Sequence, residues 1–236
     1  MREPLRFENS LRTPSGYLPT SIIQETRRIL LKGGFALLPS DTCYSLGALA
    51  IDENSRFKVN TVLRRVNEPI SLAFNTYLSL QVFVKMNNVI AALIERFTPG
   101  PFTIVCEASD AIADAFLKHT LGSLDGTIGI RIPDSRDERD LAGSTLYPLM
   151  TVAVRDKGKE IRDFEQAIDV VKRGIETLDE KFTWAAIPLR DDGFFYPLHS
   201  TVVRVSKMGE VKLLREGFIL FSSVEEEILL AEMDKR

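Results

Sequence analysis

The sequence is poor in the residue types that build disulfide scaffolds, metal centres and membrane spans. It has 2 cysteines and 2 histidines in 236 residues, too few for a disulfide framework or a Cys/His metal site. No apolar run approaches the roughly 20 residues that cross a bilayer, and the first ten residues lack the apolar core of a signal peptide. We therefore expect a cytoplasmic protein with Cys43 and Cys106 reduced and buried, no membrane partner and no metal held by the protein alone.

An excess of charge of one sign is also missing. The formal net charge is −3, so the surface as a whole is not built to attract polyanions such as nucleic acids. Contact with a nucleic acid would need a local basic patch. Repeats, low-complexity segments and linkers are absent as well. We expect a single domain over residues 1–236, with a core at about 20–218 and a C-terminal helix over 223–234.

The chain does contain alternating helical and strand patterns. A capping box at residues 21–24 and apolar residues at helical spacing predict helices over 21–32, 53–65, 79–96, 163–178 and 223–234. Short apolar or alternating runs predict strands over 35–38, 70–74, 102–105, 127–133, 149–154, 182–189, 194–198, 201–205 and 211–214. The turn at 190–193 would join two of these strands in a hairpin. Strands interleaved with helices predict an α/β domain built on a mixed sheet.

The most informative segment is GFALLPSDTCYSLG, residues 34–47. Its apolar run predicts a buried strand that Pro39 ends. Ser40, Asp41 and Thr42 follow at the end of that strand, where open α/β sheets usually bind ligands. The alternative is an ordinary turn in which these side chains bond to the backbone. Asp41 in particular suits a cap of the backbone that follows it.

Six motifs in order resemble those of the YrdC/YciO-like family, whose best-known members are threonylcarbamoyl-adenylate synthases. The family's PTDTVYGLG corresponds to PSDTCYSLG at residues 39–47, and its Lys-x-Arg pair and nearby proline correspond loosely to 63–65 and Pro69. The remaining motifs are PGP-x-T at 99–103, G-x-R-x-P at 129–133, STVV at 200–203 and LREG at 214–217. Order and spacing agree over roughly residues 20–218, so we expect the family fold.

The resemblance implies a twisted mixed sheet with flanking helices around a concave, positively lined cavity. In active members this cavity takes ATP, threonine and bicarbonate together with Mg²⁺, and releases threonylcarbamoyl-adenylate and pyrophosphate. A partner complex then transfers the carbamoyl group to a tRNA adenosine. Negative charge accumulates at the α-phosphate, so such a site needs cationic and hydroxyl groups more than a strong base.

Matching positions assign the substrate end of the cavity to Ser40, Thr42, Tyr44 and Arg131, with Tyr44 either lining the cavity or packing behind it. Arg131 also stands out without the resemblance. It opposes the isoleucines of its strand, so it does not face the core and needs an anion. That anion is either a ligand phosphate or carboxylate, or an acidic side chain on a neighbouring helix.

The resemblance assigns nucleotide phosphates to Ser200 and Thr201, and a catalytic or phosphate-binding role to Arg64 or Arg65. Thr151 is expected to supply a compensating nucleotide contact. Arg215 either closes the cavity rim or pairs with a neighbour. His199 next to this motif does not indicate a hydrolase triad, because the sequence has no GxSxG elbow and no acid at a suitable spacing.

Three family positions have lost their polar side chains. Leu63 by helix phase, or Val62 by counting back from Pro69, stands where the family has lysine, and Val152 and Val154 stand where it has serine and asparagine. An orphaned buried hydrogen-bond partner costs about 1–3 kcal/mol, so these changes should weaken nucleotide binding unless Thr151 or Arg155 compensates. Residues 179–199 also differ from the family pattern, and we expect them to form an extra hairpin over the cavity.

Two functions fit these observations. The first is a threonylcarbamoyl-adenylate synthase or a diverged relative, with ATP, threonine and bicarbonate as substrates and Mg²⁺ arriving with the nucleotide. The second is a non-catalytic protein that binds tRNA, double-stranded RNA or a nucleotide through the same cavity and the basic residues Lys58, Arg64 and Arg65.

Overall fold

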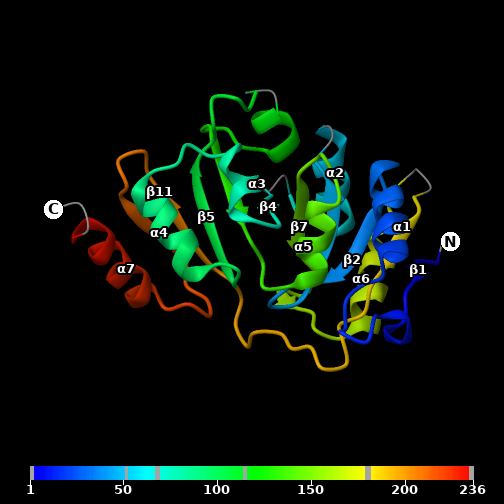
Figure 1. Ribbon diagram of the computed structural model, residues 1–236. Coiled ribbons are helices and arrows are strands. Elements are labelled where there is room, and N and C mark those ends of the chain that lie inside the picture. Colours follow the sequence, from blue (N-terminus) through cyan, green and yellow to red (C-terminus); the bar gives the residue numbers. More distant parts are fainter. Residues whose placement is uncertain (1–2, 51–52, 67–69, 114–115, 179–181, 234–236) are drawn as a thin grey trace.

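The computed structural model describes residues 3–50, 53–66, 70–113, 116–178 and 182–233, and it shows a mixed sheet flanked by helices (Figure 1). The strands are β1 (Leu5–Arg6), β2 (Phe35–Pro39), β3 (Tyr44–Leu49), β4 (Leu72–Ala73), β5 (Phe102–Glu107), β6 (Thr127–Arg131), β7 (Leu149–Ala153), β8 (Arg155–Asp156), β9 (Lys159–Glu160), β10 (Trp184–Ala186), β11 (Thr201–Val205) and β12 (Val211–Arg215). The α-helices are α1 (Thr20–Leu31), α2 (Glu53–Val62), α3 (Tyr77–Gln81), α4 (Asn88–Phe97), α5 (Arg136–Gly143), α6 (Phe164–Ile175) and α7 (Phe221–Met233). A 3₁₀ turn, η1 (Asn9–Leu11), and a π-helical turn, η2 (Phe116–Leu121), complete the elements.

The large sheet has 10 strands in the order β1-β10-β2-β3-β7-β4-β6-β5-β11-β12. Parallel pairs such as β10 with β2 and β5 with β11 occur beside antiparallel pairs such as β2 with β3 and β3 with β7. Strands β8 and β9 form a separate hairpin. In Figure 1 the N-terminus lies near β1 at one end of the sheet, and α7 packs beside α4 at the other. The α/β class and the mixed sheet expected from the sequence are confirmed.

Strand β2 is buried on both faces. Phe35 and Leu37 belong to the main core, which includes residues of α2 and α6, whereas Ala36 and Leu38 belong to a second cluster with residues of α1 and α5. Successive side chains of a strand point to opposite faces, so a continuous apolar run fits a strand covered by helices on both sides.

Two helix starts differ from the prediction. Helix α1 begins at Thr20 after Pro19, and no side-chain capping bond forms there, so the predicted capping box is wrong. Helix α7 begins at Phe221 rather than at Ser223, because the Phe221 N–H donates to the Glu216 carboxylate at 2.8 Å. In both cases the chain enters the helix earlier than the side-chain signal predicts.

The predicted helix over 79–96 is two helices. Between α3 and α4, Val84 pairs with Ala108 beside strand β5. Asn87 then caps α4, since its side-chain oxygen accepts the Ile90 N–H at 2.9 Å. The periodic apolar residues on both sides of this break pack into one core, and the sequence pattern therefore concealed it.

The predicted hairpin over 182–198 does not form, although residues 179–181 of this region lie outside the described chain. Strand β10 instead inserts between β1 and β2, parallel to both, and Trp184 is fully buried there. The chain then runs from β10 to β11, at the far side of the sheet, as the long yellow-to-orange segment along the lower edge in Figure 1. Residues 187–200 thus connect two distant strands.

Cys43 and Cys106 are buried free thiols, as expected. None of the helices in the described ranges combines the length and apolar character that a bilayer crossing requires.

Candidate functional site

One face of the sheet carries a row of polar side chains. Ser45, Thr103, Arg131 and Thr151 each precede or follow a strand residue of the main core, so they point to the opposite face. The strand registers place them on the same face, since Gly47 pairs with Thr151 and Ile104 pairs with Ile130. Because the strands are neighbours, these side chains converge.

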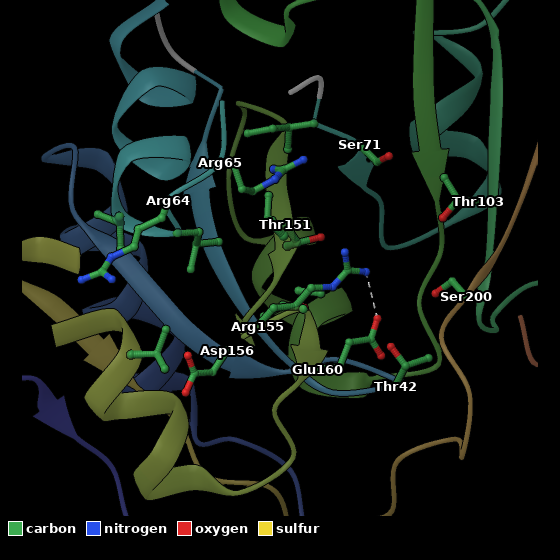
Figure 2. Close-up of a pocket in the computed structure, with 18 of the residues that line it drawn as sticks. Thr42, Arg64, Arg65, Ser71, Thr103, Thr151, Arg155, Asp156, Glu160 and Ser200 are labelled. Atoms are coloured by element: carbon green, nitrogen blue, oxygen red, sulfur yellow. Dashed lines mark hydrogen bonds and ion pairs between the residues drawn. The ribbon is translucent and has the colours of Figure 1, made fainter. Parts of the chain in front are cut away.

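This face forms the floor of a pocket of about 990 Å³ (Figure 2). The pocket is rich in cations. Its cationic residues are Arg64, Arg65, Arg131, Arg155, Lys157, Arg173 and Arg215, and its acidic residues are Asp156 and Glu160. The hydroxyl groups come from Thr42, Ser45, Ser71, Thr103, Thr151 and Ser200. A cavity with this excess of positive charge suits a ligand that carries several negative charges.

Arg131 lines the pocket, and an acidic residue of the chain itself balances part of its positive charge. Its guanidinium donates to the Asp41 carboxylate at 2.5 Å and to the Ser40 hydroxyl at 3.2 Å. The acidic partner thus comes from the turn after β2, whereas the salt-bridge alternative placed it on a neighbouring helix. The second Asp41 oxygen accepts the Asp134 N–H at 3.2 Å, so Asp41 does not cap the backbone that follows it. Ser40 is buried and is not among the residues that line the pocket, so its assignment to the substrate stays a prediction.

Two other predicted ligand residues are structural. Tyr44 is buried, packs against Phe164 and Phe195, and accepts the Leu189 N–H at 2.8 Å through its hydroxyl. Thr201 is fully buried, and its hydroxyl bonds to the backbone of residues 217 and 219. Both side chains point away from the lining because the alternation of their strands directs them there.

Arg215 and Ser200 lie at the pocket and touch each other. Arg215 donates through Nε and through one Nη to the Ser200 carbonyl, at 3.1 and 2.8 Å. Burial, together with the positive charges of Arg155 and Arg131, lowers the pKa of Arg215, although Glu160 opposes this. The positive charges of Arg155 and Arg131 thus lie close enough to Arg215 to act on it, although burial is the larger cause.

Arg64 and Arg65 both line the pocket but point in different directions. In Figure 2 the Arg65 guanidinium points toward the pocket interior, whereas that of Arg64 points away from it. Arg64 has φ of 53°, a left-handed conformation that ends α2 and turns the next residue inward. Lys58 lies 4.6 Å from the Phe182 ring and does not line this pocket. Of the three basic residues predicted to act together, only Arg64 and Arg65 therefore line it.

The positions that lack the family's polar residues lie in two different environments. Leu63 and Val152 line the pocket and form part of an apolar wall with Val62, Ile70, Val170 and Val202. Val154 is fully buried in the main core, and its N–H donates to the Tyr44 carbonyl at 2.8 Å. Only the first two change what a ligand meets, contrary to the expectation for Val154.

The sequence reading missed several lining residues, Ser45, Ser71 and Thr103 among them. Each is a small polar residue beside a core residue of its strand, and that alternation was the available signal. Gly129 leaves room for one of them, since a Cβ there would lie 2.5 Å from the Ser71 hydroxyl. Across the pocket, Arg155 pairs with Glu160 at 3.2 Å in the β8–β9 hairpin (Figure 2).

The described residues bring together no group of three acidic, histidine or cysteine side chains that could hold a metal ion. The arrival of Mg²⁺ with the nucleotide therefore stays a prediction. His199 bonds through Nε2 to the Glu216 carbonyl at 2.8 Å, which gives its ring a structural partner.

The fold and the pocket define an α/β protein with a cavity lined mainly by cationic and hydroxyl side chains. The sequence matches the family model described as telomere recombination, that of Sua5, YciO and YrdC, over residues 28–217. The chain belongs to this family.

Three relatives show how far the likeness reaches. The "Putative threonylcarbamoyl-AMP synthase" of Methanocaldococcus jannaschii is 29% identical over 140 residues, which are 59% of this chain and 63% of that protein. The structure of Pyrococcus abyssi Sua5 complexed with L-threonine has a TM-score of 0.72 at 22% identity, covering 96% of this chain and 60% of that one. Escherichia coli YciO has a TM-score of 0.70 at 20% identity, covering 92% and 96%. The chain thus spans less than two thirds of the first two relatives but nearly all of YciO.

Proposed function

We propose that this protein binds ATP and L-threonine in the pocket and forms threonylcarbamoyl-AMP. The threonine amine condenses with bicarbonate to a carbamate and water. A carbamate oxygen then attacks the α-phosphorus of ATP, the bond to the β-phosphate oxygen breaks, and pyrophosphate leaves. The observation that carries the proposal is the excess of cationic over acidic side chains around the pocket, which Arg65, Arg155 and Arg215 help to form.

The relatives support the choice of substrates. The names of the M. jannaschii protein and of a Pyrococcus abyssi relative state threonylcarbamoyl-AMP synthesis, and the Sua5 structure contains L-threonine. The volume of about 990 Å³ is large enough for a nucleotide beside an amino acid.

The lining residues could divide the work. Arg65, Arg155 and Arg215 line the pocket and would neutralise a triphosphate. Arg131 and Thr42, which line the same pocket, would hold the carboxylate of the amino acid. When bound with the nucleotide, Mg²⁺ would add charge neutralisation at the phosphates. The chain itself contributes position and fixed positive charge, which favour the α-phosphate attack over hydrolysis.

Pyrophosphate release tests the proposal. The protein is incubated with ATP, bicarbonate and Mg²⁺, with and without L-threonine, and mass spectrometry identifies the adenylate. We expect release that depends on threonine. Release no greater than in the threonine-free control would overturn the synthase proposal.

Arginine variants test the pocket assignment. Replacing Arg215 or Arg65 by methionine removes a charge-assisted hydrogen bond of about 1.5–3 kcal/mol, so release should fall by about 10- to 100-fold. The matched control is Arg28→Met on α1, where the arginine is exposed and pairs with Glu25 in its own helix. Equal effects of all three substitutions would place the reaction elsewhere.

The exposed cations at the rim favour RNA binding as a second candidate. Arg64, Lys157 and Arg173 are exposed residues of the pocket lining and come from the turn after α2, the β8–β9 turn and α6. An electrophoretic shift with tRNA and with double-stranded RNA at low and moderate salt tests it. Binding that weakens steeply with salt, and that falls on reversal of these charges, supports this candidate. Absence of a shift at low salt overturns it.

A further inference from the structure

A carboxyl group is enclosed behind the pocket wall. Glu138 lies in the first turn of α5, where its N–H donates to the Ser135 hydroxyl at 3.3 Å. Its side chain is fully buried, and within the described residues neither carboxylate oxygen has a hydrogen-bond partner of normal geometry.

Two groups beside Glu138 also line the pocket. Within the described chain, Nε of Arg131 and Oγ1 of Thr151 are buried and lack a hydrogen bond. The hydroxyls of Thr151 and Ser40 lie near enough to the carboxyl group to lower its pKa. The wall between Glu138 and the ligand space therefore contains a donor and a hydroxyl whose bonding capacity is unused.

We propose that Glu138 is a neutral carboxylic acid that donates its proton to Thr151 Oγ1, so that the Thr151 hydroxyl donates into the pocket to an anionic oxygen of the ligand. Glu138 is then a positioning residue that acts through Thr151. The inference deepens the proposed function and rests on it for the choice of ATP as the ligand.

The net charge of the buried groups around Glu138 supports the neutral form of its carboxyl group. Arg131 already faces one carboxylate, Asp41, at 2.5 Å. A second buried carboxylate would give this cluster a net negative charge beside a pocket built for anions, without water to solvate it. Burial and the negative charge of Asp41 raise the pKa of Glu138, and the positive charge of Arg131 opposes them only in part. The other acid of this turn, Asp137, faces away and pairs with Arg12 at 2.6 Å.

A hydroxyl has one proton, so its direction depends on its neighbour. Beside the neutral acid, Thr151 accepts from Glu138 and its own proton is available to the ligand. Beside an ionised carboxylate, Thr151 would donate to Glu138 and present only lone pairs to the ligand. Loss of the Glu138 proton therefore removes a donor from the pocket and adds a negative charge behind it, and both weaken anion binding.

The protonation state is measured first, without a ligand. Carbon-13 NMR of the Glu138 carboxyl in the full chain, assigned by its loss in Glu138→Gln, should show the neutral form at pH about 7. Thr151→Val should shift that signal, whereas Thr103→Val, a matched change elsewhere on the same face, should leave it in place. An ionised carboxylate, or a signal insensitive to Thr151→Val, overturns the proposal.

Calorimetric titration with ATP then tests the positioning role. The affinity of the wild type should fall as pH rises toward the titration of Glu138, and Glu138→Gln, whose amide can still donate to Thr151, should remove that fall. Glu138→Met should lose about tenfold in affinity and should add nothing in the Thr151→Val background. Additive effects, or the same pH profile in Glu138→Gln, overturn the positioning role. Absence of ATP binding at every pH would contradict the proposed function instead, while the NMR result would still decide the state of Glu138.

Discussion

Arg131 and Asp41 form an ion pair of 2.5 Å between the end of β6 and the turn after β2, and the Asp41 side chain is fully buried. The pair joins two of the family motifs, PSDTCYSLG and GIRIP, in one contact. Arg131 therefore meets a ligand with part of its charge already balanced, and Asp41 fixes the direction of its guanidinium. Arg131 also lines the pocket.

Removal of the Asp41 charge should destabilise the fold. Asp41→Asn leaves a buried guanidinium with a weaker partner, so the free energy of unfolding in urea should fall by about 3 kcal/mol. The control is Asp140→Asn, which breaks the exposed pair with Arg136 at 2.8 Å in helix α5 and should cost less than about 1 kcal/mol. Similar losses in the two variants would show that burial adds nothing to the Arg131 pair.

The two valines at family polar positions should respond differently to serine. Val152→Ser places a hydroxyl at the pocket wall, so stability should change by less than about 1 kcal/mol and ATP affinity should rise by up to about tenfold. Val154→Ser removes core volume and buries a hydroxyl, so stability should fall by about 2–4 kcal/mol. Thermal unfolding and ATP titration of both variants measure this. A Val154→Ser protein as stable as Val152→Ser would contradict the placement of Val154 in the core.

Stability should depend on pH through Glu138. Its pKa is raised in the folded protein by burial, so between the ordinary pKa and the raised one the folded state binds a proton that the unfolded state lacks. Stability therefore falls as pH rises through this window. Glu138→Gln removes the dependence, so its melting temperature should exceed that of the wild type increasingly from pH about 4 to about 8. A constant difference across this range would mean that Glu138 titrates normally.

Both thiols should resist alkylation. Burial is the main reason that the pKa values of Cys43 and Cys106 are raised to about 12, and the thiolate is the reactive form. Mass spectrometry after iodoacetamide treatment at pH about 8 should show an unmodified native protein and two modified cysteines in urea. Ser222→Cys, which adds a cysteine at an exposed position of α7, should gain one modification without urea. Rapid modification of native wild type would contradict the burial of these side chains.

The sequence was most informative where local pattern and family motif agree. The run 35–38 and the alternating segment 127–131 form β2 and β6, and Arg131 does face away from the isoleucines of its strand. Residues 44–49 form strand β3, which the sequence reading had not identified because small residues such as Ser45 and Gly47 weaken the apolar signal.

Contacts between distant segments lay beyond the sequence reading. The hairpin expected over 182–198 does not form because β10 pairs with β1 on one edge and with β2 on the other. The residues next to β10 in the sequence give no sign of either pairing. Tyr44 and Thr201 match family positions, yet their side chains point away from the pocket because register and alternation, rather than residue type, decide direction.

The sequence by itself therefore determined the α/β class, the family, most strands and the presence of a positively lined cavity that contains Arg131. Only the tertiary structure decided which side chains form that site. Asp41, Ser40 and Glu138 come to lie beside Arg131 because the turn after β2 and helix α5 meet behind the wall. The physical reason is that local pattern specifies which residues are apolar and where strands begin, whereas the partners of a buried charge depend on how the strands pair and which helix covers them.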